Sequence, residues 1–152
     1  MINMKICLVG SAGGHLTQLL ELEDLWNQYN HFYITYKEES SKYLPKSQKT
    51  YFVKDPMRNP LYLLLTFLQS LYIFLLENPN IIISTGAGIT IPITFLGKIF
   101  GKKIVFIESL SRVKDPSITG KILYPISDLF LVQWKSLLKK YGKRARYGGR
   151  VF

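Results

Sequence analysis

Short apolar runs, rich in β-branched and aromatic residues, alternate along the chain with longer segments whose apolar residues recur at helical spacing. This pattern predicts strands for the short runs and helices for the longer segments. The predicted strands are Lys5–Gly10, His31–Tyr36, Thr50–Val53, Ile81–Ser84, Lys103–Ile107, Leu129–Gln133 and a last short one at Ala145–Tyr147. The predicted helices are His15–Tyr29, a short one within Glu38–Gln48, Asn59–Leu76, Ile89–Phe100, Ser117–Pro125 and Trp134–Tyr141.

Regular alternation of strand and helix predicts an α/β fold: a single doubly wound, Rossmann-like domain with a parallel sheet and helices on both faces. Residues 1–152 contain no Pro-, Gly- or Ser-rich linker, no internal repeat and no low-complexity tract, so we expect one domain. In such sheets, ligands bind beyond the carboxyl ends of the strands. Candidate functional residues are therefore expected in the turns that follow the strands.

The turn after the first strand is glycine-rich, over Gly10–His15. Glycines let the backbone approach a ligand closely, and the helix start offers free N–H groups to an anion. The segment is neither a P-loop nor an in-register G-x-G-x-x-G motif, which disfavours ATP and dinucleotide binding. His15 at the helix start is expected to be neutral and able to accept a proton from a sugar hydroxyl. The alternative is a histidine that only caps or packs against the turn.

A second glycine-rich turn, Ser84–Gly88, also follows an apolar strand. The two turns predict phosphate-binding loops at one edge of one sheet, and hence a sugar-phosphate or nucleotide-type ligand. A third segment, Glu108–Arg112, leaves the fifth strand at the same edge. Glu108 could act as a base or hold sugar hydroxyls, and Arg112 could bind a phosphate through two hydrogen bonds. The alternative is a structural ion pair between these two side chains.

The next helix opens with hydroxyl, glycine and lysine residues over Ser117–Lys121. Thr119 and Lys121 there could form a second anion site. Ordinary N-capping by Ser117 explains the same pattern.

The formal charge of +10 is uneven, because a basic cluster lies in the last stretch of the chain. The cluster consists of Lys135, Lys139, Lys140, Lys143, Arg144, Arg146 and Arg150. Such a cluster attracts anionic surfaces such as lipid head groups or an acidic partner. Nucleic acid is disfavoured because the aromatic residues form no exposed stacking pattern. A solvated basic tail is the alternative.

The single cysteine excludes an intrachain disulfide and favours a cytoplasmic location. One Cys and two His form no zinc-binding pattern.

The segment Leu61–Leu76 carries no charge. It is shorter than the roughly 20 residues that a bilayer-spanning helix needs. It could lie in the core, contact a partner, or lie in the membrane interface with Lys54 and Arg58 facing head groups. A true membrane span is the remaining alternative.

Several of these motifs together resemble the asparagine-linked glycosylation protein 14 family, in order and over nearly the whole chain. The matching segments are Gly10–His15, Ser84–Gly88, Ile107–Val113, Ser117–Pro125 and Asp128–Trp134. The resemblance implies the acceptor-side half of a split GT-B glycosyltransferase, equivalent to the N-terminal half of a single-chain enzyme. A separate subunit would bind the UDP-sugar donor. The bacterial branch of the family serves capsular and exopolysaccharide assembly on a polyprenyl-diphosphate carrier.

The resemblance also implies roles for individual residues. We expect His15, and second Glu108, to act as the base of an inverting, metal-independent transfer that needs no cofactor. The contacts expected with the partner subunit are Arg150, Val151 and Phe152. The residues expected to bind the polyprenyl-diphosphate-sugar acceptor or its phosphates are Gly13, Gly14, Thr85, Gly86, Gly88, Ser109, Arg112, Thr119 and Lys121. The protein is then expected at the cytoplasmic face of the cell membrane, peripheral and on an anionic surface.

Two other functions remain open at the level of sequence. The chain could be a non-catalytic scaffold that recruits and activates a partner glycosyltransferase. It could also be a stand-alone nucleotide-binding enzyme such as a reductase, for which Glu38 would be the ribose-binding acid after the second strand.

Overall fold

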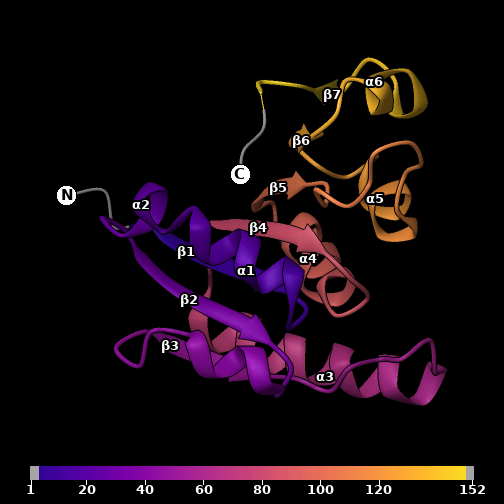
Figure 1. The fold of residues 1–152 in the computed structure, drawn as a ribbon. Helices are drawn as coiled ribbons and strands as arrows, with labels where there is room; N and C mark the ends of the chain where they lie inside the picture. The colour runs from indigo at the N-terminus through magenta and orange to yellow at the C-terminus, as the bar shows by residue number, and fades with distance from the viewer. Residues whose placement is uncertain (1–3, 150–152) are drawn as a thin grey trace.

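The computed structural model describes residues 4–149, in which seven strands form one parallel sheet (Figure 1). The strands are β1 (Lys5–Gly10), β2 (Asn30–Thr35), β3 (Lys49–Phe52), β4 (Ile81–Gly86), β5 (Lys103–Ile107), β6 (Leu129–Leu131) and β7 (Ala145–Arg146). Their order in the sheet is β3-β2-β1-β4-β5-β6-β7, and every neighbouring pair is parallel. The predicted Rossmann-like α/β fold is confirmed.

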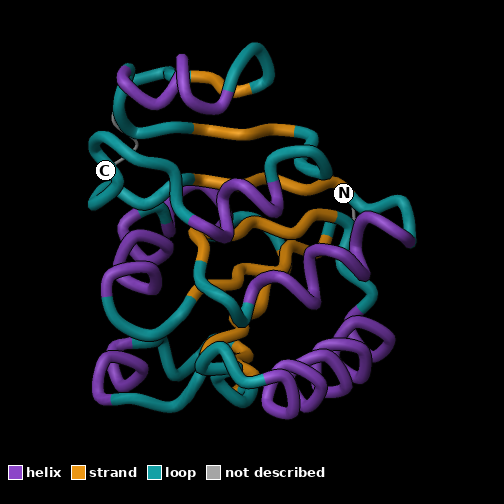
Figure 2. The backbone as a smooth tube through the Cα atoms, turned by 90° about the vertical axis from the view of Figure 1, so that its right-hand side faces the viewer, coloured by secondary structure: helices purple, strands orange, loops and turns teal. Residues whose placement is uncertain are grey.

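Helices lie on both sides of the strands (Figure 2). They are α1 (Gly14–Glu21), α2 (Glu23–Trp26), a 3₁₀ helix (Glu39–Tyr43), α3 (Pro60–Glu77), α4 (Thr90–Ile99), α5 (Ile118–Leu123) and α6 (Ser136–Tyr141). The first two pack on one face of β1 and β2, whereas α3 and α4 pack on the opposite face. Leu123 of α5 and Leu137 of α6 pack with Phe106 and Phe130 near the β7 edge.

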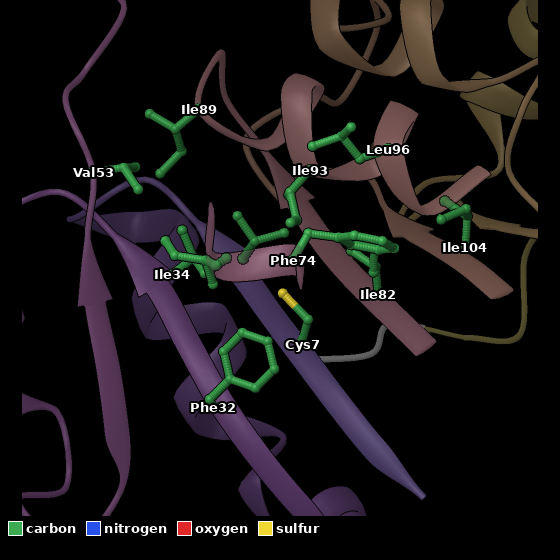
Figure 3. Packing of buried hydrophobic residues seen from close by; sticks show 12 residues of the cluster. Cys7, Phe32, Ile34, Val53, Phe74, Ile82, Ile89, Ile93, Leu96 and Ile104 are labelled. Atoms are coloured by element: carbon green, nitrogen blue, oxygen red, sulfur yellow. The ribbon is translucent and has the colours of Figure 1, made fainter. Parts of the chain in front are cut away.

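The largest apolar cluster lies between the sheet and the pair α3–α4 (Figure 3). Cys7, Phe32 and Ile82 project from three neighbouring strands toward Phe74 of α3 and Ile93 of α4, and all five are buried. Fully burying one such side chain contributes roughly 1.5–3 kcal/mol. This cluster therefore holds α3 against the sheet through only one side of the helix.

The helix predicted over His15–Tyr29 is broken in the structure. Leu22 separates α1 from α2, and its N–H bonds to the Leu19 carbonyl at 3.1 Å, three residues back rather than four. Residues three apart align in such a tight turn. The break therefore brings Leu22 onto the same buried side as Leu16 and Leu19, against Trp26.

The start of α3 agrees with its prediction. Asn59 precedes Pro60, and its side-chain oxygen accepts a hydrogen bond from the Leu61 N–H at 2.9 Å. Proline at the first helical position lacks an N–H that would have no partner there in any case. The helix ends at Asn78, which adopts a left-handed conformation with φ 45°.

The C-terminal end of α3 is tied to the sheet through one buried carboxylate. Glu77 pairs with the ammonium groups of Lys5 at 3.0 Å and Lys49 at 2.5 Å, and it accepts a hydrogen bond from Tyr51. Burial by itself raises the pKa of this carboxyl group, but the hydrogen bonds from its three partners outweigh burial and lower the pKa to about 2. Because this value lies below the ordinary 4.5, the ionised carboxylate stabilises the folded state.

We expect Glu77→Gln to lower the free energy of unfolding at pH 7 by about 1–3 kcal/mol, since charged hydrogen bonds are lost. In the parent chain, the Glu77 contribution is present above pH 4.5 and is lost as the pH falls toward 2. The variant should show a shallower fall in stability over that range in urea titrations. Glu39→Gln, which removes an exposed ion pair with Lys42, serves as the control and should cost about 0.5 kcal/mol or less. Equal acid sensitivity of the parent and Glu77→Gln would contradict this account.

Candidate functional site

The two glycine-rich turns meet at the centre of the sheet. Strand β1 pairs with β4, with Gly10 opposite Gly86, while β2 and β3 lie on the other side of β1. From β1 the chain first adds β2 and β3 on one side and then returns to add β4 to β7 on the other side, so the strand order reverses between β1 and β4. In doubly wound sheets, such a reversal opens a crevice at the carboxyl ends of the strands.

Two hydrogen bonds lock these turns together. The Nδ1 of His15 lies 2.6 Å from the Thr85 carbonyl oxygen, and the Thr85 hydroxyl donates to the His15 carbonyl at 2.9 Å. Because a carbonyl only accepts, Nδ1 is assigned the proton, which leaves Nε2 of the neutral ring as a proton acceptor. Gly86 has φ 110°, and a Cβ there would lie 3.2 Å from the His15 ring. Glycine is thus needed for the imidazole to lie against the β4 turn.

His15 is held in its neutral form. Burial is the main influence and lowers the pKa of the imidazole below its ordinary 6.5, and the nearby charge of Arg112 lowers it further. The Thr85 carbonyl and Glu108 act in the opposite direction without outweighing burial. The ring is therefore unprotonated at neutral pH and ready to accept a proton.

A cleft of about 450 Å³ opens in front of His15. Five residues predicted for the site line it: His15, Gly88, Ser109, Arg112 and Thr119. A second cavity of about 600 Å³ shares His15, Ser109 and Ser111 with the first and adds the predicted Gly14. The structure thus brings side chains from the carboxyl ends of β1, β4 and β5 together with the start of α5.

One wall of the cleft was not among the predicted site residues. Pro56, Arg58, Asn59, Pro60 and Leu63 belong to the turn before α3 and to its first residues. Arg58 has φ 58°, a left-handed conformation that is uncommon for a residue with a side chain. The sequence signal that could have located this wall is the helix start at Asn59-Pro60, which puts the preceding turn at the same edge of the sheet.

The remaining predicted residues lie behind or beside the cleft. Thr85 and Gly86 hold His15 from behind, and the Gly13 N–H donates to the Ser40 hydroxyl at 2.7 Å. Lys121 is exposed and does not line the cleft. The predicted partner contacts Arg150, Val151 and Phe152 lie outside the described residues.

Glu108 lies below the cleft floor, with 1% of its surface exposed. One carboxylate oxygen accepts from the Ser109 N–H at 2.9 Å, and the other accepts from Ser117, through its N–H and its hydroxyl, and from Tyr141. Within residues 4–149, no ion pair joins it to Arg112. A general base must reach the proton that it removes, so this geometry favours a positioning role. The predicted role of Glu108 as a second base stays a prediction.

The side chains that line the cleft suit a ligand with a negatively charged part and an apolar part. Arg58 and Arg112 supply positive charge, hydroxyl groups come from the β5 loop and the start of α5, and no carboxylate lines the described part of the cleft. Leu63, Ile91 and Ile118 supply apolar surface. No group of three potential metal ligands occurs among the residues that the structure describes.

The cluster around Glu108 requires glycine at position 120. A Cβ at Gly120 would lie 2.6 Å from the Glu108 carboxylate and 2.8 Å from the Ser117 hydroxyl. We therefore expect Gly120→Ala to destabilise the fold by about 1–3 kcal/mol through overpacking. Thermal unfolding measures this. Gly148→Ala, where a Cβ meets nothing within 4 Å, is the matched control. An unchanged melting temperature for Gly120→Ala would contradict this description of the cluster.

Comparison with known proteins gives one family model, described as oligosaccharide biosynthesis protein Alg14 like, which matches residues 52–151. The chain is 42% identical over 89 residues to the UDP-N-acetylglucosamine transferase subunit ALG14 of Candida albicans, an alignment covering 55% of this chain and 41% of that protein. The alignment with the same subunit from Mus musculus is 30% identical over 187 residues and covers 98% of this chain and 83% of that one. The chain thus spans less than half of the Candida albicans subunit and most of the mouse subunit.

Solved structures share the fold at low identity. MurG of Acinetobacter baumannii superposes with a TM-score of 0.77 at 11% identity, over 95% of this chain and 45% of that one. UDP-N-acetylglucosamine 2-epimerase from Rickettsia bellii gives a TM-score of 0.74 at 13% identity, over 97% of this chain and 45% of that one. At these identities the likeness extends to the fold alone. The described fold corresponds to about half of each of these larger chains.

Proposed function

The chain belongs to the family of Alg14-like oligosaccharide biosynthesis proteins, and on that premise we propose that it is the acceptor-side subunit of a two-component inverting glycosyltransferase. The observation that carries the proposal is the neutral His15, with Nε2 free to accept a proton, in a cleft that also holds Arg112 and hydroxyl groups. A partner subunit would hold the UDP-sugar donor. The names of the relatives make UDP-N-acetylglucosamine the first donor to test.

The acceptor in this proposal is a polyprenyl-diphosphate-linked sugar, as in capsular or exopolysaccharide assembly. Arg112 and the N–H groups at the start of α1 would bind its phosphates, because cations and helix N-termini attract anions. The apolar wall around Ile91 and Ile118 would contact the first part of the prenyl chain. Such an acceptor places the protein on the inner face of the cell membrane, where its net positive charge favours anionic lipid.

Transfer proceeds by attack of an acceptor hydroxyl on the anomeric carbon of the donor sugar. His15 Nε2 takes the hydroxyl proton as the new carbon–oxygen bond forms. The bond from the anomeric carbon to the UDP oxygen breaks, and UDP leaves with the electron pair. The hydrogen bond between Nδ1 and the Thr85 carbonyl keeps the ring oriented during this step, and the hydrogen bond from the Thr85 hydroxyl holds the His15 backbone in place, which maintains the reactive geometry.

The direct test combines the chain with its partner subunit, a UDP-sugar and a lipid-linked acceptor. We expect turnover only with both subunits present. His15→Ala should lower kcat by roughly 10²–10⁴-fold, since a general base is removed. Binding of the variant to the partner, measured by size-exclusion chromatography, is the control. Full turnover without a partner would refute the split enzyme, and full turnover of His15→Ala in a normal complex would favour the scaffold function.

The pH dependence gives a separate prediction. Because the pKa of His15 in the folded chain lies below 6.5, the base is active at neutral pH. The rate should fall as the pH drops below that folded pKa, where the imidazole takes up a proton. This fall in kcat/KM at low pH, the acidic limb of the pH profile, should be absent from the residual activity of His15→Ala. An acidic limb that persists unchanged in this variant would assign it to another group.

A further inference from the structure

Helix α3 has polar residues on its buried side and apolar residues on its exposed side, the opposite of a typical surface helix in a water-soluble protein. The side packed on the sheet carries the polar residues Thr66, Ser70 and Glu77, all buried, beside Ile73 and Phe74. The side facing away from the sheet is formed by apolar residues at helical spacing, each 48–72% exposed. They are Leu61, Leu64, Leu65, Leu68, Tyr72, Leu75 and Leu76. A surface helix in water normally has its polar residues on the outside.

Each buried polar side chain except Ser70 has a specific partner. The Thr66 hydroxyl donates to the Lys54 carbonyl at 2.6 Å, and Glu77 forms the ion pairs with Lys5 and Lys49. These contacts fix the rotation of α3 about its own axis. A rotation that turned the leucine side toward the sheet would break this hydrogen bond and these ion pairs, and it would remove Ile73 and Phe74 from the core.

The end of α4 adds two exposed apolar residues next to α3. The Phe74 and Phe100 rings lie 5.1 Å apart and join the two helices, and Ile99 and Phe100 are 75% and 54% exposed. We call the seven α3 residues listed above, with Ile99 and Phe100, the apolar ridge. Helix α3 runs along one margin of the molecule in Figure 1.

Cations without carboxylate partners lie beside α3. Within residues 4–149, Lys54, Arg58 and Lys102 take part in no ion pair. The Lys54 ammonium lies 4.5 Å from the Tyr62 ring centre, and the Lys102 ammonium lies 6.0 Å from that of Phe74. Lysine is depleted at protein–protein interfaces and leucine is rare among their energetic hot spots. Leucines bordered by cations instead match the boundary between acyl chains and anionic head groups.

We propose that the apolar ridge docks the protein on the surface of an anionic phospholipid bilayer, with α3 lying in the plane of the interface. By length and composition alone, the 18 residues of α3 would suffice to cross a membrane, although the uncharged segment Leu61–Leu76 within it is shorter than a usual span of about 20 residues. However, its attachment to the sheet through Glu77 holds it against β1 and β3, and lipid cannot surround it. The inference deepens the proposed function, on which it rests for the lipid nature of the acceptor. The cleft adjoins the start of the same helix, since Pro60 and Leu63 of α3 line it, so a prenyl chain would have a short path from the bilayer to the cleft.

The test measures partitioning of the full chain onto vesicles of phosphatidylglycerol and phosphatidylcholine in equal amounts. The double variant Leu64→Gln, Leu68→Gln should lower the partition coefficient by about tenfold or more, since two apolar side chains that would insert into the lipid are replaced by polar ones. Leu25→Gln is the matched control, because Leu25 is equally exposed, at 60%, but lies on α2 at the opposite face of the sheet. All three positions are exposed, so melting temperatures should stay unchanged.

Wild-type protein that fails to bind these vesicles, or a double variant that binds as well as Leu25→Gln, would overturn the proposal. If the wild-type protein is a dimer and the double variant is a monomer, the ridge instead binds a second copy of the chain. No acceptor, donor or partner subunit is present in this assay. Failure here is therefore distinct from failure of the transferase test, which can be run in detergent.

A fluorescent probe locates the contact directly. Cys7 is fully buried and burial raises its thiol pKa, so an engineered surface cysteine is labelled selectively. An environment-sensitive dye on Leu64→Cys should shift to the blue when vesicles are added, and the same dye on Leu25→Cys should not. A shift at Leu25→Cys alone would place the membrane contact on the other face.

Discussion

The candidate site depends on the meeting of the β1 and β4 turns at the point where strand order reverses. His15 and Thr85 exchange two hydrogen bonds there, across 70 residues of sequence. This pair selects the tautomer of the imidazole and keeps Nε2 available. It forms because Gly86 lets the ring approach the β4 backbone. The parallel pairing of β1 with β4 thus brings the two turns together and, through the Nδ1–Thr85 hydrogen bond, sets the tautomer of the candidate base.

Most of the fold could be predicted from the sequence because strand and helix periodicity is local. The Gly10–His15 and Ser84–Gly88 turns were also predictable, since carboxyl ends of parallel strands meet at one edge. The break at Leu22 was not, because it depends on packing against Trp26 rather than on a breaking residue. Nor was the burial of Glu108, which depends on Tyr141, a partner 33 residues away. Side-chain placement of this kind arises from tertiary contacts, which no local pattern records.

The same limit applied to α3. The sequence showed an uncharged helix and left its surroundings open among core, membrane and partner. The buried polar contacts of Thr66 and Glu77 decide which side faces the sheet, and this leaves the leucines outside. The first turn of that helix also forms a wall of the cleft. One helix therefore joins an apolar surface to the cleft in which we propose that the acceptor binds, an arrangement that would suit an amphiphilic acceptor.

The most direct measurement of the central claim is histidine-selective nitrogen NMR of the full chain. Only His15 and His31 contribute signals, and His31, which is buried in β2, serves as an internal reference. The account predicts an Nδ1-protonated His15 with a pKa below 6.5, and an Nε2 signal that shifts when a short-chain prenyl-diphosphate sugar is added. An Nε2-protonated tautomer, or an Nε2 signal that does not respond to this ligand while binding is seen elsewhere, would contradict it.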